Sequence, residues 1–254
     1  MKRIAIILLG VLAATSPSMA QVMVPIAAPM MTQGPNGKSY RPITVSVQGE
    51  YFHWVEPATG YVLSVEPKGT ALLGSVDVPV GQRFIVGGWA SKDQQKVLFI
   101  TTTNHGQTLY GNANLTTNWL EGHVTYLLKS TPETSLGVSV GVLSASEPST
   151  TFKLTSGQTT QVTERSASSD RWTEINFLLS RTVAHGKNAS QPLVGATIGY
   201  VRQQTSGAGS GLTYGVSISC PIASKVSIDA STWNISPSGG STITRFGLGC
   251  GVHF

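Results

Sequence analysis

The sequence predicts an all-β fold in which antiparallel strands close into an up-and-down barrel that crosses a membrane. Charged residues make up 11% of the 254 residues, whereas about a quarter is usual in a soluble domain. From residue 41 onward, apolar side chains recur at every second position, which is the period of a strand with one apolar face. No segment after residue 20 has the length and apolarity of a transmembrane helix. Strands in lipid cannot leave backbone groups unpaired, so the sheet must close on itself.

The N-terminal 20 residues have the three parts of a secretory signal peptide. Residues 2 and 3 are basic, residues 4–14 are apolar, and Ser18 and Ala20 are small residues at the positions that a signal peptidase recognises. The apolar run is shorter than the roughly 18 to 20 residues that a membrane anchor needs. We therefore expect export from the cytoplasm and cleavage before Gln21.

Residues 21–40 are rich in proline and methionine and show no period, so we expect a flexible periplasmic leader before a barrel at residues 41–254. Methionines without a histidine do not indicate a metal site, and no motif indicates a cofactor. Cleavage removes Lys2 and Arg3 and lowers the formal charge from +5 to +3. This small positive charge does not indicate nucleic-acid binding.

Alternation predicts twelve strands, an even number that returns both chain ends to the periplasmic side of the barrel. The weakest pair is 95–103 and 107–115, and removing both leaves ten strands and the same parity. The expected strands are 42–54, 69–79, 82–91, 95–103, 107–115, 118–129, 134–144, 171–183, 192–204, 211–220, 224–234 and 242–254.

Two connections between strands are similar to each other. Residues 76–84 and 218–226 each place a proline-apolar pair and small polar residues between two strands. Tight turns of this kind are typical of the periplasmic side of membrane barrels, whereas longer loops face outward. The Ser/Thr-rich stretch 144–170 has room for a small hairpin around Phe152 to Leu154. The expected outer loops are 55–68, 92–95, 144–170, 205–210 and 235–241.

The last strand has the clearest alternation in the chain. Its apolar face carries Phe246, Leu248, Cys250, Val252 and the terminal Phe254. This pattern resembles the C-terminal signal that the barrel-assembly machinery recognises in Gram-negative outer-membrane β-barrel proteins. The resemblance also covers the signal peptide and the two tight turns. It is porin-like in class, and it implies an outer-membrane location and the assembly machinery as a partner.

If the apolar faces contact lipid, the opposite faces point into the barrel. Glycine, serine and threonine dominate these opposite faces, with charged residues scattered among them. Small and charged inward residues favour a hydrated passage, although about ten to twelve strands give a borderline diameter. The alternative is a structural ion-pair network that fills the lumen. The candidate selectivity residues are Glu50, Asp77, Glu121, His123, Glu174, Asp229 and Arg245.

We therefore expect a small passive channel for hydrophilic solutes, surrounded by outer-membrane lipid and lipopolysaccharide. The first alternative is a structural or adhesin-type surface barrel that acts through loop 144–170, with Trp172 anchoring the next strand at the outer interface. A barrel-embedded hydrolase is less favoured. His123 beside Glu121 could form a general base, but no nucleophile motif occurs in the sequence, so we expect no enzyme.

The two cysteines fall on strands that have one strand between them. A spacing of ~4.8 Å between neighbouring strands places Cys220 and Cys250 ~10 Å apart. A disulfide needs Cα atoms within about 7 Å of each other. We expect two free thiols that face lipid or the interface.

Overall fold

The computed structural model describes residues 32–33, 39–55, 68–102, 107–131, 134–157, 159–183, 192–204, 210–223, 225–237 and 242–254. Within these ranges, no helix has the length and apolarity to cross a membrane. The predicted signal peptide lies outside the described residues. Two short strands, β1 (Thr32–Gln33) and β2 (Ser39–Tyr40), pair with each other inside the segment expected as a leader.

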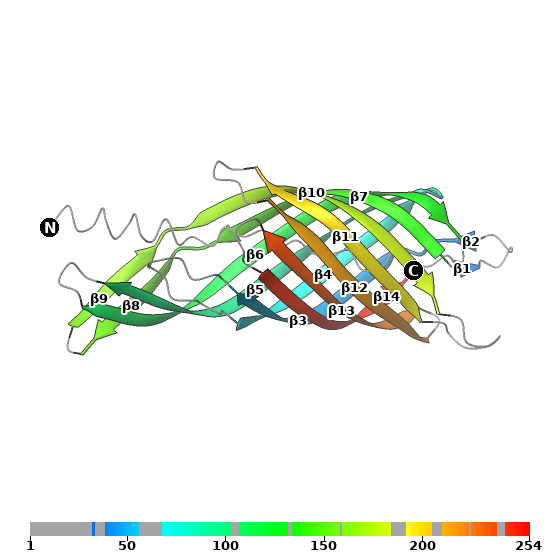
Figure 1. Ribbon diagram of the computed structural model, residues 1–254. Coiled ribbons are helices and arrows are strands. Elements are labelled where there is room, and N and C mark those ends of the chain that lie inside the picture. Colours follow the sequence, from blue (N-terminus) through cyan, green and yellow to red (C-terminus); the bar gives the residue numbers. More distant parts are fainter. Residues whose placement is uncertain are drawn as a thin grey trace.

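Ten antiparallel strands form a closed barrel, which confirms the predicted fold class (Figure 1). Each strand pairs with its neighbours along the ring, and the last strand pairs with the first over residues 242–253 and 44–55. The barrel strands are β3 (Thr44–Val55), β4 (Lys68–Val80), β5 (Phe84–Thr102), β6 (Thr108–Ser130), β7 (Thr134–Glu147), β10 (Ser168–Thr182), β11 (Leu193–Gln203), β12 (Ser210–Ala223), β13 (Val226–Pro237) and β14 (Thr242–His253).

The barrel has the alternative count of ten strands and not the preferred twelve, because two expected strands continue their neighbours. Residues 95–103 fall largely within β5 and residues 107–115 within β6. The expected loop at 92–95 is wrong, since pairing between β5 and β6 runs without interruption from Lys92↔Asn118 to Thr102↔Thr108. The polar residues that suggested a turn there belong to the parts of β5 and β6 that extend beyond the apolar band of the barrel's outer surface.

Two further strands stand outside the ring and confirm the hairpin expected around Phe152 to Leu154. They are β8 (Thr150–Ser156) and β9 (Thr159–Arg165), and they pair with each other antiparallel. The hairpin lies beside the projecting ends of β5 and β6, at the end of the molecule opposite to the C-terminus (Figure 1). We refer to β8, β9, residues 97–102 and residues 108–117 together as the outer extension.

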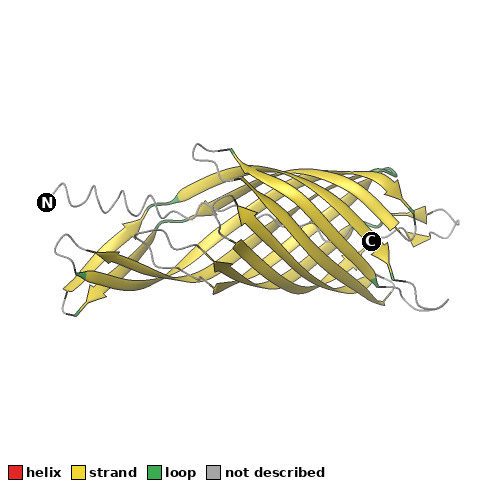
Figure 2. Ribbon diagram, in the orientation of Figure 1, coloured by secondary structure: helices red, strands yellow, loops and turns green. Residues whose placement is uncertain are grey.

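The barrel has an apolar outside and a polar inside, as the alternation predicts. Val47, Val140 and Leu248 are about half or more exposed, whereas Ser46 and Ser139 on the other face are almost completely buried. Strands and short turns account for nearly all of the described chain (Figure 2). The tight turn between β4 and β5 uses Gly81 at φ 70°, a conformation that favours glycine.

The cysteine prediction is confirmed. Cys220 on β12 lies opposite Ile228 on β13, and Ile228 lies opposite Cys250 on β14. One strand therefore separates the two thiols, and both are free.

Candidate functional site

The structure places all seven candidate selectivity residues on the inner face with buried side chains. It brings them together in three groups of hydrogen-bonded side chains. Glu50 joins Arg245, and Glu121 joins Asp77 and His123 with Glu174 nearby. Asp229 accepts a hydrogen bond from Ser227 on its own strand, 2.9 Å away, and Ser227 also lies 3.1 Å from His253 Nε2 on β14. The other ring nitrogen of His253 lies 3.2 Å from the Thr44 hydroxyl on β3.

The first network is centred on Arg245 of β14. Its guanidinium donates to Glu50 on β3 at 2.6 Å and to Asp93 on β5. It also lies over the Phe52 ring at 5.1 Å and the Trp233 ring at 5.3 Å. All three charged side chains are at most 1% exposed. The arginine thus ties three strands together by contacts that are strong only because water is excluded.

Asp93 is a member of this network that the sequence analysis missed, because its position had been assigned to a loop. It also accepts hydrogen bonds from Ser91 at 2.7 Å and from the Trp119 indole at 3.0 Å. The alternation of inward and outward positions along β5 could have identified Asp93 as an inward residue. Continuing the alternation of β5 from Ile85 and Trp89 places Asp93 on the inner face.

The second network surrounds His123 of β6. Its Nδ1 lies 2.9 Å from Glu121 and its Nε2 lies 3.0 Å from Asp77 on β4. Because both ring nitrogens face carboxylate oxygens, an imidazolium that donates from each nitrogen satisfies the geometry. The ring is therefore fixed between two acids, and neither nitrogen is left to activate a hydroxyl group.

Glu174 on β10 adds a third carboxylate to this region. A Cβ built on Gly141 would lie 2.7 Å from Glu121 Oε1 and 2.8 Å from Glu174 Oε1, so both side chains flank that glycine. Within the described part of the chain, no cation lies within ion-pair distance of the Glu174 carboxylate. The group is only 3% exposed, and its electrostatic neighbours are Glu121, His123 and Asn176.

Where a glycine faces the interior, the space that its absent side chain leaves is filled by side chains from neighbouring strands. A Cβ on Gly87 would collide with Asp77 and His123, and one on Gly199 would collide with the Asn176 amide. From the sequence alone, inward glycines predict room for water in the lumen. In the structure, Asp77 and His123 fill the gap at Gly87 and Asn176 fills the gap at Gly199, as close packing requires.

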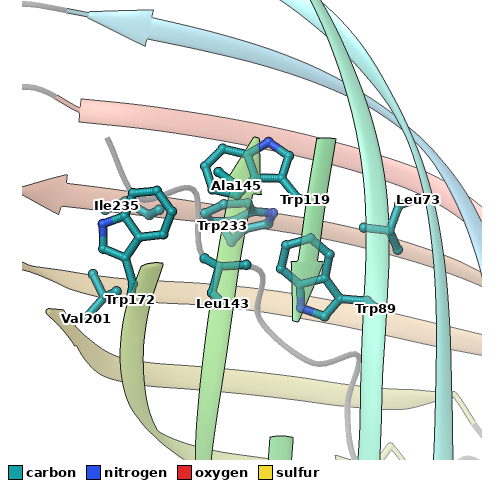
Figure 3. Close-up of a cluster of buried hydrophobic side chains, with 9 residues drawn as sticks. All are labelled: Leu73, Trp89, Trp119, Leu143, Ala145, Trp172, Val201, Trp233 and Ile235. Atoms are coloured by element: carbon teal, nitrogen blue, oxygen red, sulfur yellow. The ribbon is translucent and has the colours of Figure 1, made fainter. Parts of the chain in front are cut away.

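In contact with the Arg245 network, four tryptophans form one contiguous buried cluster with aliphatic side chains (Figure 3). Trp119 on β6 and Trp233 on β13 stand five strands apart in a ring of ten, which places them on opposite walls. Trp119 and Trp172 rings are 5.6 Å apart. The complete cluster is Leu73, Trp89, Trp119, Leu143, Ala145, Trp172, Val201, Trp233 and Ile235.

The expected interfacial position of Trp172 is wrong, because its side chain is 1% exposed and points inward. Its sequence position carried the signal for this. Trp172 is two residues from Glu174, and Trp119 is two residues from Glu121, so each shares a face with a residue already assigned to the lumen. The general preference of tryptophan for membrane interfaces was the weaker guide.

The periplasmic end of the interior is crossed by Arg41, which precedes β3. Its guanidinium donates to Ser130 at 2.7 Å and to Ser135 at 2.8 Å. These serines belong to β6 and β7, three and four strands away around the ring. Arg41 therefore braces the barrel mouth from one wall to another.

The outer extension has its own small core. Leu109, Ala113 and Leu115 of β6 pack with Phe152 and Leu154 of β8, separately from the barrel cluster. Gly111 permits the close crossing of the two strands, since a Cβ there would overlap the Lys153 carbonyl.

Glu147, at the end of β7, fixes the base of the β8–β9 hairpin. It accepts from Arg165 of β9 at 2.5 Å and from Thr117 of β6 at 3.2 Å. Its contacts connect the hairpin to the projecting strands as well as to the barrel rim. The extension is consequently a folded unit with defined attachment points.

The residues of the predicted assembly signal lie at the seam where the barrel closes. Phe246, Leu248 and Phe254 are exposed on the outer face, and Val252 is half-buried. The terminal Phe254 exchanges two backbone hydrogen bonds with Ile43, at 2.9 and 3.1 Å. The last strand thus completes the ring with its apolar face toward the membrane.

Two solved structures share this architecture over most of the chain. The translocator domain of the autotransporter NalP from Neisseria meningitidis has a TM-score of 0.58 at 12% identity and covers 84% of this chain and 89% of that one. The β-domain of the Bordetella autotransporter BrkA has a TM-score of 0.58 at 9% identity and covers 84% of this chain and 100% of that one. Identities this low show the fold alone.

The closed ring, the lipid-facing band and these structural neighbours define the class: the chain is an outer-membrane β-barrel protein. Its location is therefore the outer membrane. No protein-family profile matches the sequence, and no curated protein sequence matches it.

Proposed function

We propose that the protein is a surface-recognition barrel, in which the membrane-spanning ring is an anchor and the outer extension binds a partner outside the cell. The observation that carries this proposal is the pairing of Glu147 directly with Ser168 across β7 and β10. A two-residue turn suffices to join strands at such a position. The chain instead inserts residues 148–167, which fold into the β8–β9 hairpin and its core.

The partner that best fits the extension is an extended peptide segment of another surface protein. Within the described residues, β9 pairs with β8 alone, so its second edge presents unpaired backbone donors and acceptors. A free edge of this kind can accept one more strand. Val162, at the middle of β9, is 61% exposed and offers an apolar contact, while Thr160 and Glu164 on the same face offer polar ones.

A passive channel is the competing proposal, and the interior gives it less support. The tryptophan cluster connects opposite walls, and inward glycine gaps are filled by polar side chains. Fixed charges in the lumen are neutralised by one another, as in the Arg245 network, and are then poorly placed to attract solutes. We also propose no catalytic step at His123, because its ring is held between two carboxylates.

Export by residues 1–20 and recognition of the C-terminal strand by the barrel-assembly machinery complete the proposal. The alternating apolar residues end on Phe254, in the strand that pairs with β3 and closes the barrel. This position fits a signal that the assembly machinery recognises before that pairing forms. Exchanging Phe254 for Ser should lower the amount of folded protein in the outer membrane without affecting export across the inner membrane.

The test compares the full chain with a variant in which residues 148–167 are replaced by Asn-Gly. Both are displayed on Escherichia coli, and surface amounts are matched by antibody labelling of an epitope tag in an outer loop. Attachment is measured to three immobilised probes: fibronectin, collagen and purified outer-membrane vesicles. Heat-modifiability on a gel shows that each barrel is folded, and planar-bilayer recording is performed on both purified proteins.

We expect the full chain to attach to at least one probe and the turn variant to lose that attachment, with both barrels folded and neither giving conductance steps. Attachment that survives the replacement would show that the extension is not the binding part. Regular conductance steps from the pure full-length protein would favour the channel and overturn the assignment of the barrel as an anchor.

A further inference from the structure

The outer surface of β5 and β6 changes abruptly from apolar to polar. Ala90 and Leu120 are the last exposed residues of the continuous apolar band on these strands, and the next outward-facing positions are Lys92 and Asn118. The band marks the hydrocarbon layer, so these polar positions begin at the level of the lipid headgroups. In the outer leaflet of this membrane, that level is occupied by lipopolysaccharide.

Three exposed lysines gather on this polar surface. Lys68 of β4 lies directly opposite Lys96 of β5. Lys92 lies on the same face of β5, four residues before Lys96 and closer to the apolar band. Like charges directly opposite each other across a sheet are destabilising. None of the three has an ion-pair partner within the described part of the chain. An anion from outside the protein would relieve the repulsion.

The acidic residues of these strands all face the other way. Glu50 on β3, Asp77 on β4, Asp93 on β5 and Glu121 on β6 are buried inside the barrel. Charge is thus sorted by face, with carboxylates inward and lysines outward. Among the residues that the structure describes, no carboxylate on the outer face of β4 and β5 cancels the positive potential of these lysines.

Neutral donors continue the lysine surface on both sides. One row of directly paired residues crosses four strands as His53, Lys68, Lys96 and Asn114. Gln94, between the two lysines of β5, is also exposed. Amide and imidazole groups beside ammonium groups suit a ligand that combines phosphate with sugar hydroxyls.

We propose that this face, which we name the lysine face (Lys68, Lys92, Lys96, with His53, Gln94 and Asn114), binds the phosphorylated sugar headgroup of lipopolysaccharide in the outer leaflet. The acyl chains of the lipid would lie along the apolar band at Ala90 and Leu120. The ammonium groups would neutralise the phosphates, and the amides would bond the sugar hydroxyls. The site is independent of the partner proposed for the outer extension.

The test uses the purified full chain folded in a zwitterionic detergent. Binding of fluorescent deep-rough lipopolysaccharide is titrated, with enzymatically dephosphorylated lipopolysaccharide, phosphatidylglycerol and inorganic phosphate as unlabelled competitors. The test variant combines Lys68→Gln, Lys92→Gln and Lys96→Gln. The matched control combines Lys129→Gln, Arg181→Gln and Lys225→Gln, which removes three exposed cations from the periplasmic end of the barrel.

A basic residue near an anionic membrane surface contributes about a factor of five in binding, so we expect the test variant to bind about 100-fold more weakly. The control should bind within twofold of the unaltered chain. Dephosphorylated lipopolysaccharide should compete poorly, and salt should weaken binding of the unaltered chain but not of the test variant. Heat-modifiability confirms that each variant is folded.

Three outcomes would overturn the proposal. The test variant binding within twofold of the unaltered chain would show that the lysines do not form the site. Equal competition by phosphatidylglycerol or by inorganic phosphate would show that any anion suffices. Effective competition by dephosphorylated lipopolysaccharide, measured on the unaltered chain, would exclude phosphate recognition even if the triple variant failed to fold.

Discussion

Removing Arg245 should destabilise the barrel far more than removing any surface arginine. The guanidinium is the cation shared by Glu50 and Asp93, and all three side chains are at most 1% exposed. Arg245→Met leaves two carboxylates buried without a counter-charge, and losing one partner of a buried ion pair costs about 3–5 kcal/mol. The ring contacts with Phe52 and Trp233 are retained in part by the methionine side chain.

The assay is equilibrium unfolding in urea of protein refolded into lipid vesicles, followed by tryptophan fluorescence. We expect Arg245→Met to lower the free energy of unfolding by about 3–5 kcal/mol. Adding Glu50→Gln and Asp93→Asn should recover most of this loss, because the uncompensated charges are then gone. Arg202→Met, at an exposed position on β11, should change stability by less than about 0.5 kcal/mol. A loss below about 1 kcal/mol for Arg245→Met would refute the assignment of this network as structural.

Three further predictions concern the interior and the extension. Gly87→Val should lower stability by about 1–3 kcal/mol, since a side chain there collides with two buried polar groups; an unchanged heat-modifiability temperature would contradict this. Combining Trp119→Ala, Trp172→Ala and Trp233→Ala should produce conductance steps in planar bilayers where the unaltered chain gives none, because the cluster that connects opposite walls is removed; a silent but folded variant would show that the passage is blocked elsewhere. Glu147→Gln should speed proteolysis within the β8–β9 hairpin several-fold while the barrel stays intact, because its contacts fix the hairpin base; equal cleavage rates would count against that role.

Much of the fold follows from period-two alternation, because a one-residue shift would turn every side chain to the wrong face. The same constraint placed Glu121, His123 and Arg245 inside the barrel correctly. It also predicted the separation of Cys220 from Cys250 by one strand. These properties depend on local sequence and on strand order, and both can be inferred without knowing what lies across the lumen.

The strand count and the state of the lumen depend on non-local contacts and could not be inferred in this way. Lys92 and Asp93 resemble turn residues, and only pairing with residues 117 and 118 shows that the strand continues. An inward glycine is equally compatible with water and with a neighbour's side chain. At Gly141 the choice is decided by Glu121 and Glu174, which come from two other strands.

The distribution of charge explains why we assign function to the outside of this barrel. Arg245 satisfies Glu50 and Asp93, and His123 satisfies Asp77 and Glu121, so most inward charges already have partners inside the protein. A selectivity filter needs charges that remain free to meet a solute. Among the described residues, the lysines of β4 and β5 have no such partners and face the headgroup layer. Within the same ranges, β9 pairs with no strand other than β8. The groups left to bind something else lie on the outer surface of the ring and on the extension, and both proposals follow from that separation.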